Sequence, residues 1–416
     1  IPEGARWQDV REVTVNIGQA LQGAMRAIEQ ANPDTLQGIF GDASWTNKER
    51  LSDAMLTNLI EHYSQHTLNL ANVPDDKLGN AYEYLIKEFA DDSGHTAAEF
   101  YTNRTVVKLM TMIMDPQPGE SVYDPTCGSG GLLLNCALHL KDEGKEYRTL
   151  KLYGQEINLL TSAIARMNMF MHGIEEFEIV RGDTLANPGL IENGELKKFN
   201  VILANPPYSI KSWDRKAFEN DPYGRNLWGT PPQGCADYAF QQHIQKSLDL
   251  GNGRSISLWP HGILFRDAEM QMRRKMIEED LVECVIGLGP NLFYNSPMEA
   301  CLLITKTKKD ESKKGKVLII NAVKEVRQDK NIAFLENNHI ERIYNAYTTY
   351  KDEEGFCKVV SIEDVLKHNA SLNMALYVSN VDSSEEQISL DDALTNWTQS
   401  SKQLKASMEQ LFKELG

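Results

Sequence analysis

The sequence predicts an α/β protein whose doubly wound sheet domain lies between helical segments. Between residues 121 and 306, short apolar runs typical of strands alternate with amphipathic stretches typical of helices. Near both ends, over 1–90 and 394–415, apolar residues instead recur every three or four positions. We therefore expect a helical domain over 1–95, an α/β domain over 96–320 and a C-terminal helical region over 321–416.

Three amphipathic stretches, 10–31, 47–68 and 76–89, predict the helices of the N-terminal domain. Asn-Pro and Val-Pro breaks separate these stretches. A further helix is expected at 104–115, because the sequence Pro-Gln-Pro-Gly at 116–119 stops it.

Apolar runs bounded by glycine, proline or polar residues predict the strands of the sheet. Helices at 132–140, 158–171 and 237–250 are expected between them, and a glycine ends each of the last two. The lysine-rich segment 306–316 is expected to be mainly a solvated turn. The predicted strands are 121–123, 150–155, 177–180, 199–204, 255–258, 282–286, 300–305 and 317–322.

The tetrapeptide Asn205-Pro206-Pro207-Tyr208 directly follows the apolar strand 199–204. Two prolines fix φ and remove two N–H donors, so the Asn205 side-chain oxygen and the Pro206 carbonyl can present two acceptors in a fixed geometry. A primary amine on an aromatic ring offers two matching donors, and the Tyr208 ring offers a stacking face. An ordinary Pro-Pro turn is the alternative, but the full tetrapeptide at a strand end predicts four catalytic residues that hold a planar amine.

A glycine-rich turn, Asp124 to Gly131, connects the strand 121–123 to the helix 132–140. Three glycines in four positions let a ligand approach bare backbone, and the free N–H groups of the helix start favour an anion such as an amino-acid carboxylate. No Gly-Lys-Ser/Thr follows, which excludes a phosphate-binding loop. Leu133 stands where a dinucleotide-binding turn needs glycine or alanine.

Acidic residues follow the next two predicted strands. Glu156 ends the strand 150–155, where an open α/β sheet places a carboxylate for ribose hydroxyls. Asp183 follows the strand 177–180 and can accept a hydrogen bond from an adenine amine. Either acid alone is more often an exposed loop residue. Together with the glycine-rich turn, however, they predict a site shaped for adenosine.

These residues resemble the modification (methyltransferase) subunits of type I restriction-modification systems, which are adenine-N6 DNA methyltransferases of the gamma group. The resemblance covers about residues 75–305 and extends well beyond the motifs described above. It includes the stretches 78–86, 99–104, 236–240, 260–266 and 291–294.

The resemblance implies a Rossmann-like methyltransferase domain that uses S-adenosyl-L-methionine as its cofactor. It places 99–104 over the methionine part of the cofactor, 128–130 under it, Glu156 on the ribose and Asp183 at the adenine. The family usually has proline where Asn103 stands, so a looser backbone is expected there. The predicted cofactor-binding residues are Glu99, Phe100, Tyr101, Thr102, Asn103, Arg104, Asp124, Cys127, Gly128, Ser129, Gly130, Glu156 and Asp183.

Composition limits the remaining possibilities. The net charge of −16 is unfavourable for a protein that must hold DNA by itself, since Lys and Arg contacts to phosphates supply most non-specific affinity. The six cysteines show neither Cys-x-x-Cys nor paired His spacing, so no metal site and a reducing cytoplasm are expected. No apolar run is long enough to span a membrane. Position 1 is Ile rather than Met, which indicates a shortened or renumbered start.

Two further segments suggest partners. Residues 209–234 form a long Gly/Pro-rich segment, which is expected to contact an extruded nucleotide and its flanking phosphates, although an irregular surface loop is the alternative. Its basic residues Lys211, Arg215, Lys216 and Arg225 alternate with Trp213, Phe218, Tyr223 and Trp228.

After an acidic linker at 382–387, the C-terminal helix carries a coiled-coil-like seam. The resemblance implies that this helix packs on the DNA-specificity subunit, with two copies of this chain per complex and a restriction subunit as a further possible partner. We also expect too little chain after the last sheet strand for a separate target-reading domain. The seam residues are Leu394, Trp397, Leu404, Met408, Leu411 and Leu415.

The sequence therefore predicts an enzyme that transfers a methyl group directly to a flipped adenine in double-stranded DNA. Two alternatives remain open. The Asn-Pro-Pro-Tyr motif also serves enzymes that methylate the N5 amide of glutamine in proteins. The chain could instead be an inactive scaffold of a DNA-binding complex, although the intact set of site residues argues against this.

Overall fold

The computed structural model describes most of the chain, in two compact units formed by residues 1–378 and 379–416. The predicted α/β class is confirmed. The described residues are 1–68, 72–73, 75–92, 102–292, 298–329, 332–378, 394–395, 397–402, 404–405 and 407–408.

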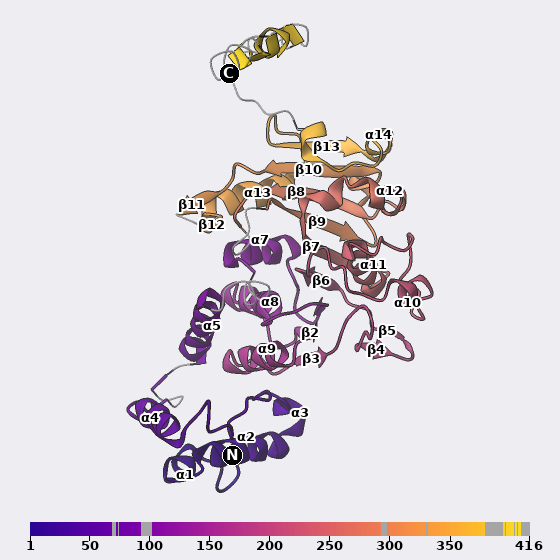
Figure 1. The fold of residues 1–416 in the computed structure, drawn as a ribbon. Coiled ribbons are helices and arrows are strands. Elements are labelled where there is room, and N and C mark those ends of the chain that lie inside the picture. The colour runs from indigo at the N-terminus through magenta and orange to yellow at the C-terminus, as the bar shows by residue number, and fades with distance from the viewer. Residues whose placement is uncertain are drawn as a thin grey trace. The chain divides into compact units, whose positions relative to one another are not determined.

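A nine-stranded sheet forms the centre of the first unit (Figure 1). Its strand order is β13-β10-β8-β9-β7-β6-β1-β2-β3, and all strands run in one direction except β9 and β13. All eight predicted strands are present in this sheet. Their bounds are β1 Ser121–Asp124, β2 Lys151–Glu156, β3 Phe177–Arg181, β6 Val201–Ala204, β7 Arg254–Pro260, β8 Val282–Leu288, β9 Ala300–Lys306, β10 Lys316–Ala322 and β13 Cys357–Ser361.

Helices cover both faces of this sheet, because the buried strands carry apolar side chains on both sides. One apolar cluster joins the sheet to α7 (Arg104–Met114), α8 (Gly131–Asp142), α9 (Leu159–Met171) and α13 (Asn337–Thr349). A second cluster joins the opposite face to α11 (Asp237–Ser247), α12 (Met270–Glu278) and α14 (Ile362–Lys367). The result is the three-layer arrangement that alternating strands and helices predict.

The N-terminal helices have a small apolar core of their own. The predicted helix 10–31 is divided into α1 and α2, because Asn16 adopts a left-handed backbone conformation with φ 56°. Among the described residues, no helix combines the length and the apolar character needed to cross a membrane. These helices are α1 Trp7–Arg11, α2 Ile17–Ala31, α3 Pro33–Leu36, α4 Asp53–Ser64 and α5 Asp75–Asp92.

Residues 321–378 differ from the predicted C-terminal helical region. They contribute the edge strand β13, which pairs with β10, and a small hairpin of β11 (Arg327–Asp329) and β12 (Ile332–Phe334). The compact unit therefore continues past the predicted boundary at 320 and ends at Val378.

The strands β1 and β6 lie side by side at the centre of the sheet and are parallel. From β1 the order continues through β2 to β3, whereas from β6 it continues in the opposite direction. Such a reversal of strand order opens a crevice at the carboxyl ends of the strands, where α/β proteins bind their ligands. The glycine-rich turn after β1 and the Asn-Pro-Pro-Tyr turn after β6 both begin at this edge.

The lysine-rich segment between β9 and β10 is only partly the solvated turn that its composition predicts. Lys309 is 4% exposed, pairs with Asp280 at 2.5 Å and donates to the Lys316 carbonyl. Lys306 and Lys313 both form ion pairs with Glu283, which is fully buried on β8. These lysines thus neutralise carboxylates that the sheet would otherwise bury alone.

Glu283 supplies a testable contribution to stability. Its carboxylate also accepts a hydrogen bond from the Tyr347 hydroxyl at 2.9 Å. Burial opposes the charge, but Lys306 and Lys313 outweigh burial and lower the pKa of Glu283. We expect Glu283→Gln to cost about 3 kcal/mol at neutral pH, measured as a lower melting temperature.

The pH dependence follows from the direction of this shift. Because the folded-state pKa lies below the unfolded one, the contribution of Glu283 is complete above the usual glutamate pKa of about 4.3. It is lost as the pH falls through the lower folded value, so wild type and Glu283→Gln should converge in acid. Glu311→Gln is the control, since Glu311 forms an exposed pair with Lys314 and its loss should not change the melting temperature. Equal effects of the two substitutions would contradict this interpretation.

Candidate functional site

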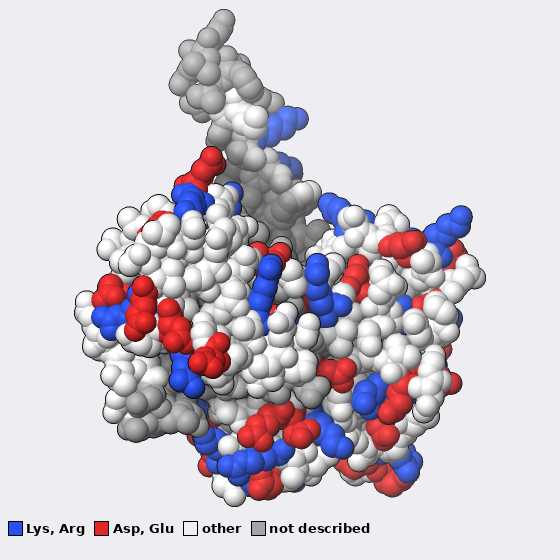
Figure 2. Space-filling model, turned by 90° about the horizontal axis from the view of Figure 1, so that it is seen from below, with Lys and Arg blue, Asp and Glu red and all other residues white. Residues whose placement is uncertain are grey.

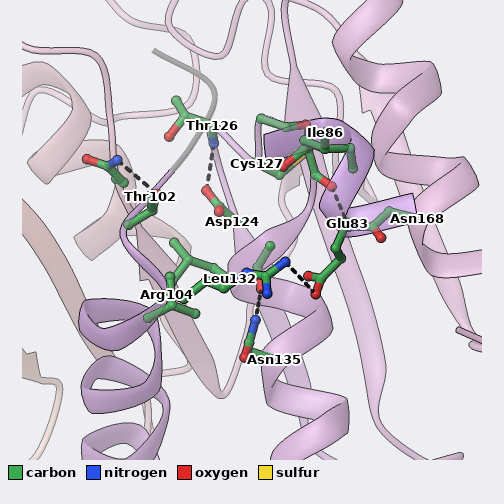
Figure 3. A pocket seen from close by; sticks show the side chains of 15 residues that line it. Glu83, Ile86, Thr102, Arg104, Asp124, Thr126, Cys127, Leu132, Asn135 and Asn168 are labelled. Atoms are coloured by element: carbon green, nitrogen blue, oxygen red, sulfur yellow. Dashed lines mark hydrogen bonds and ion pairs between the residues drawn. The ribbon is translucent and has the colours of Figure 1, made fainter. Parts of the chain in front are cut away.

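A pocket lies over the carboxyl ends of β1 and β6, where the two predicted turns meet (Figure 3). It is lined by the glycine-rich turn, by the helices α5, α7, α8 and α9, and by Asn205. The lining residues are Glu83, Ile86, Thr102, Arg104, Val107, Asp124, Thr126, Cys127, Gly128, Ser129, Gly131, Leu132, Asn135, Asn168 and Asn205.

The glycine-rich turn needs its glycines at two positions. Gly128 has φ 53° and Gly130 has φ 80°, a backbone region that residues with a Cβ rarely adopt. A Cβ on Gly130 would also lie 2.8 Å from Met169 Cε. The turn is tied to β2 by the Cys127 N–H, which donates to the Gln155 carbonyl at 2.9 Å. The glycines therefore serve the backbone geometry of the turn and its close packing against Met169.

Two carboxylates are buried beside this turn. Asp124 is 1% exposed and accepts a hydrogen bond from the Thr126 N–H at 3.0 Å. Burial raises the pKa of Asp124 to about 7, and the nearby charge of Glu156 adds to this rise. Glu156 accepts from the N–H groups of Gly128 at 3.0 Å and Asn158 at 2.8 Å, yet burial still raises its pKa. A cationic ligand group placed here would favour the charged form of both acids.

Asp183 lies after β3, as predicted, but it does not line the pocket. Its Oδ1 accepts hydrogen bonds from the N–H groups of Leu185 at 2.8 Å and Ala186 at 3.1 Å. The adjacent Thr184 hydroxyl donates to the Pro125 carbonyl at 2.5 Å. The Asp183 loop is thereby attached to the glycine-rich turn.

The side chain of Asn205 is oriented by two partners. Its Nδ2 donates to the Thr102 Oγ1 at 3.0 Å, and its Oδ1 accepts a hydrogen bond from the Tyr208 hydroxyl. With Thr102 accepting from Nδ2 and Tyr208 donating to Oδ1, both ends of the amide are hydrogen-bonded. A carbonyl-type oxygen has two lone pairs, so Oδ1 keeps the capacity to accept a second proton.

The ring of Tyr208 is half-buried and packs against the second apolar cluster. Its centroid lies 6.3 Å from that of Trp259. Burial raises the pKa of Tyr208 well above its usual value, so its hydroxyl remains a donor at neutral pH. The hydrogen bond to Asn205 is therefore a role that the sequence prediction, which gave Tyr208 only a stacking face, did not include.

The segment before α7 contributes Thr102 and Arg104, whereas Glu99, Phe100 and Tyr101 lie outside the described residues. Arg104 reaches Glu83 of α5 at 3.1 Å.

Asn103 caps α7 by accepting from the Thr105 N–H at 3.0 Å, and its Nδ2 donates to the Ala333 carbonyl at 2.8 Å. These bonds show that the expectation of a looser backbone at Asn103 is wrong.

The structure gathers six of the predicted cofactor-binding residues at the pocket, together with Asn205. Gly130 and Glu156 do not line the pocket but stabilise its turn. The Gly130 N–H donates to the Cys127 carbonyl, and Glu156 accepts a hydrogen bond from the Gly128 N–H. Asn103, Asp183, Pro206, Pro207 and Tyr208 do not line the pocket. The six residues at the pocket are Thr102, Arg104, Asp124, Cys127, Gly128 and Ser129.

The sequence prediction missed the helical side of the pocket, above all Glu83 and Asn168. Asn168 is 1% exposed on α9, and its Nδ2 donates to the Ser129 carbonyl at 3.1 Å. An asparagine between two methionines in the helix 158–171 was the available signal, because buried amides need specific partners.

The segment 209–234 is mostly not the nucleic-acid surface that its composition suggests. Phe218 and Trp228 are buried in the second apolar cluster, and Arg225 is 2% exposed. The Arg225 guanidinium pairs with Asp221 at 2.6 Å and donates to the carbonyls of Thr184 and Leu185. The prediction of a DNA contact is thus wrong for these three side chains.

Lys211 and Lys216 remain exposed and available for a polyanion.

Charges of both signs are mixed on the molecular face that Figure 2 shows, and neither sign forms a continuous field there. Such a face offers no broad attraction to a polyanion.

Comparison with known proteins gives a consistent family assignment. Residues 73–386 match the family described as N-6 DNA methylase. Among solved structures, the chain is similar to the methyltransferase subunit of the type I restriction-modification system from Streptococcus thermophilus, with 32% identity and a TM-score of 0.79. This similarity covers 90% of the present chain and 80% of the other.

Curated relatives carry related names. The MjaVIII methylase subunit of a type I restriction enzyme from Methanocaldococcus jannaschii is 32% identical, over 85% of this chain and 65% of the relative. The HindI methylase subunit from Haemophilus influenzae is 29% identical, over 100% of this chain and 98% of the relative. The chain thus spans just under two thirds of the first relative and nearly all of the second.

Two acids, Glu156 at the end of β2 and Asp183 after β3, predict how ligand binding responds to substitution. We expect Glu156→Ala and Asp183→Ala each to weaken binding of S-adenosyl-L-methionine by roughly 1.5–3 kcal/mol, measured by calorimetry, since each removes a charged hydrogen-bond acceptor. Glu178→Ala is the matched control, because Glu178 is an exposed acid on β3. Unchanged affinity in both test variants would mean that the adenosine site lies elsewhere.

Proposed function

Since the chain belongs to the N-6 DNA methylase family, among the methyltransferase subunits of type I restriction-modification systems, we propose that it methylates the N6 amine of a flipped adenine in DNA. The methyl donor in this proposal is S-adenosyl-L-methionine. The observation that carries the proposal is Asn205, which lines the pocket and whose side-chain amide is hydrogen-bonded to both Thr102 and Tyr208.

The pocket fits the donor's methionine part by its polar groups. Among the described residues, the buried Asn168 Oδ1 at the pocket has no hydrogen-bond partner. Such unsatisfied atoms are costly unless a ligand or water bonds to them. Asp124 and Glu156 add negative charge for an ammonium group, while Arg104 at the rim adds positive charge for a carboxylate. These residues support a zwitterionic ligand such as an amino acid.

The chemistry needs no nucleophile from the protein. When bound, the sulfonium of S-adenosyl-L-methionine supplies an electrophilic methyl group. Asn205 Oδ1 and the Pro206 carbonyl would accept hydrogen bonds from the two N–H groups of the adenine amine and stabilise the positive charge that builds on its nitrogen. Positioning supplies the rest of the rate enhancement. Cys127 is the nearest thiol, but burial raises its pKa well above the usual value, which keeps it protonated and unreactive.

We also propose that the chain acts with partners. Its net charge of −16 gives little general affinity for DNA. The similar proteins named above are each described as a subunit. A DNA-specificity subunit would provide both base recognition and phosphate contacts, with two copies of this chain in the complex. A restriction subunit is a further candidate partner.

The test of this function is transfer of labelled methyl from S-adenosyl-L-methionine to DNA, with and without the specificity subunit. The proposal expects slow, sequence-independent transfer by the chain alone, and site-specific N6-methyladenine when the specificity subunit is added. Transfer to glutamine in a protein would support the alternative substrate. Donor binding without any transfer would support an inactive scaffold. Methylome sequencing of cells with and without the gene would identify the target site.

Asn205→Ala should abolish methyl transfer and leave donor affinity near wild type, because Asn205 faces the amine rather than the methionine. Loss of one such acceptor typically lowers the rate by a factor of about 10²–10³. Single-turnover kinetics and calorimetry measure the two quantities separately. A variant that kept more than about a tenth of the wild-type rate would contradict this role.

The C-terminal segment predicts a partner surface. The described seam residues Leu394, Trp397, Leu404 and Met408 are 52%, 70%, 63% and 49% exposed. Because 379–416 is a separate unit from the pocket, deleting 391–416 should abolish assembly with the specificity subunit while donor binding persists.

A point variant tests the same surface more sharply. Leu404→Asp should weaken assembly, measured by size-exclusion chromatography, because it places a charge in the apolar seam. Lys405→Ala, a change at an exposed neighbour outside the seam, is the control. Assembly that survives the deletion would remove this segment from the interface.

A further inference from the structure

The backbone directly after Asn205 has few N–H groups that can form stabilising hydrogen bonds. Pro206 and Pro207 have no N–H group, so the next backbone donors are those of Tyr208 and Ser209. Ser209 has φ 51°, a left-handed conformation that is unfavourable for serine. A turn with such a residue persists only where its surroundings enforce it.

The enforcing contact is made by Asp237, the first residue of α11. The Ser209 N–H donates to Asp237 Oδ1 at 2.7 Å. Asp237 is fully buried, and its position at the start of an 11-residue helix favours a negative charge. A buried carboxylate thus anchors the Ser209 N–H group, two residues after the second proline.

Asp237 is in turn fixed by Arg266. The guanidinium contacts Asp237 Oδ2 at 2.5 Å and Glu269 Oε2 at 2.7 Å. Burial opposes the charge of Arg266, but hydrogen bonds and ion pairs with the two acids raise its pKa. Cys235, Asp237 and Glu269 also present ligand-type atoms close together, but Arg266 already occupies both carboxylates. The cluster of Asp237, Arg266 and Glu269 therefore serves to support the turn rather than to bind a metal ion.

We propose that Asp237 is a positioning residue for the methyl transfer: through the Ser209 N–H it holds the Asn205 to Tyr208 turn in the conformation that presents the Asn205 oxygen. Arg266, which Glu269 also binds, keeps Asp237 in place. Asp237 acts only through the turn and contacts neither the base nor the donor. This inference rests on the proposed function for its kinetic consequence, but not for its structural one.

The kinetic test uses the full chain assembled with its specificity subunit. Asp237→Ala should lower the single-turnover rate by about a hundredfold, the effect typical of a misplaced reacting group, while donor affinity stays unchanged. Asp237→Asn keeps an oxygen for the Ser209 N–H and should recover about tenfold of this loss. Asp267→Asn, the same change at an exposed neighbouring acid, should match wild type.

Hydrogen exchange of the chain alone provides a second readout that needs no methyl transfer. In Asp237→Ala the amides of 205–212 should exchange faster than in wild type, whereas those of the glycine-rich turn 124–131 should not change. Because the prolines contribute no amide, Ser209 is one of only six amides in that range.

Three outcomes would overturn the proposal. The first is wild-type exchange over 205–212 in Asp237→Ala. The second is a loss of donor affinity that parallels the loss of rate, which would indicate general damage. The third is Asp237→Asn as slow as Asp237→Ala, since the hydrogen bond to Ser209 would then not be the cause. If the wild-type complex methylates no DNA at all, the proposed function fails, and the exchange experiment still decides whether Asp237 holds the turn.

Discussion

The parallel pairing of β1 with β6 is the constraint on which the candidate site depends. Val122 pairs with Val201 and Tyr123 with Ile202, all four at the fully buried centre of the sheet. The glycine-rich turn and the Asn205 turn are far apart in the sequence, but this pairing sets both at the same edge. The distance between the two turns is thus set by the backbone hydrogen bonds between β1 and β6. These bonds lie inside a packed core, which is more rigid than any contact between loops. Reactive groups placed in this way need little reorganisation before reaction.

The parts of this arrangement that the sequence predicted are those with local causes. The eight strands follow from short apolar runs between turn residues, and the glycine-rich turn follows from the backbone freedom of Gly128 and Gly130. Asn205 could be identified because strand, amide and prolines are contiguous. Glu156 and Asp183 could be placed because parallel strands carry their following residues to one edge. In each case a few neighbouring residues contain the physical reason.

The parts that it did not predict depend on partners distant in the chain. From its sequence context Arg225 is expected at the surface, but it is buried. The distant carbonyls of Thr184 and Leu185, together with the nearby Asp221, satisfy its donors. Asn103 reads as a loosened position, yet it is anchored by the Ala333 carbonyl. The sheet continues past the expected boundary at 320 for the same reason, since β13 joins it by pairing with β10. Composition and periodicity contain no information on which distant group will meet a given side chain.

The burial and ion pairing of basic residues also affect how DNA can be bound. The net charge of −16 counts every Lys and Arg as if it were available at the surface. Arg225 and Arg273 are fully buried, and Lys309 is nearly so. Arg254 and Arg266 are engaged by carboxylates. These basic side chains are therefore unavailable for contacts with phosphates. Exposed lysines near the pocket, such as Lys211 and Lys216, can add only local contacts. Under the proposed function, most of the electrostatic affinity for DNA must then come from another chain of the complex.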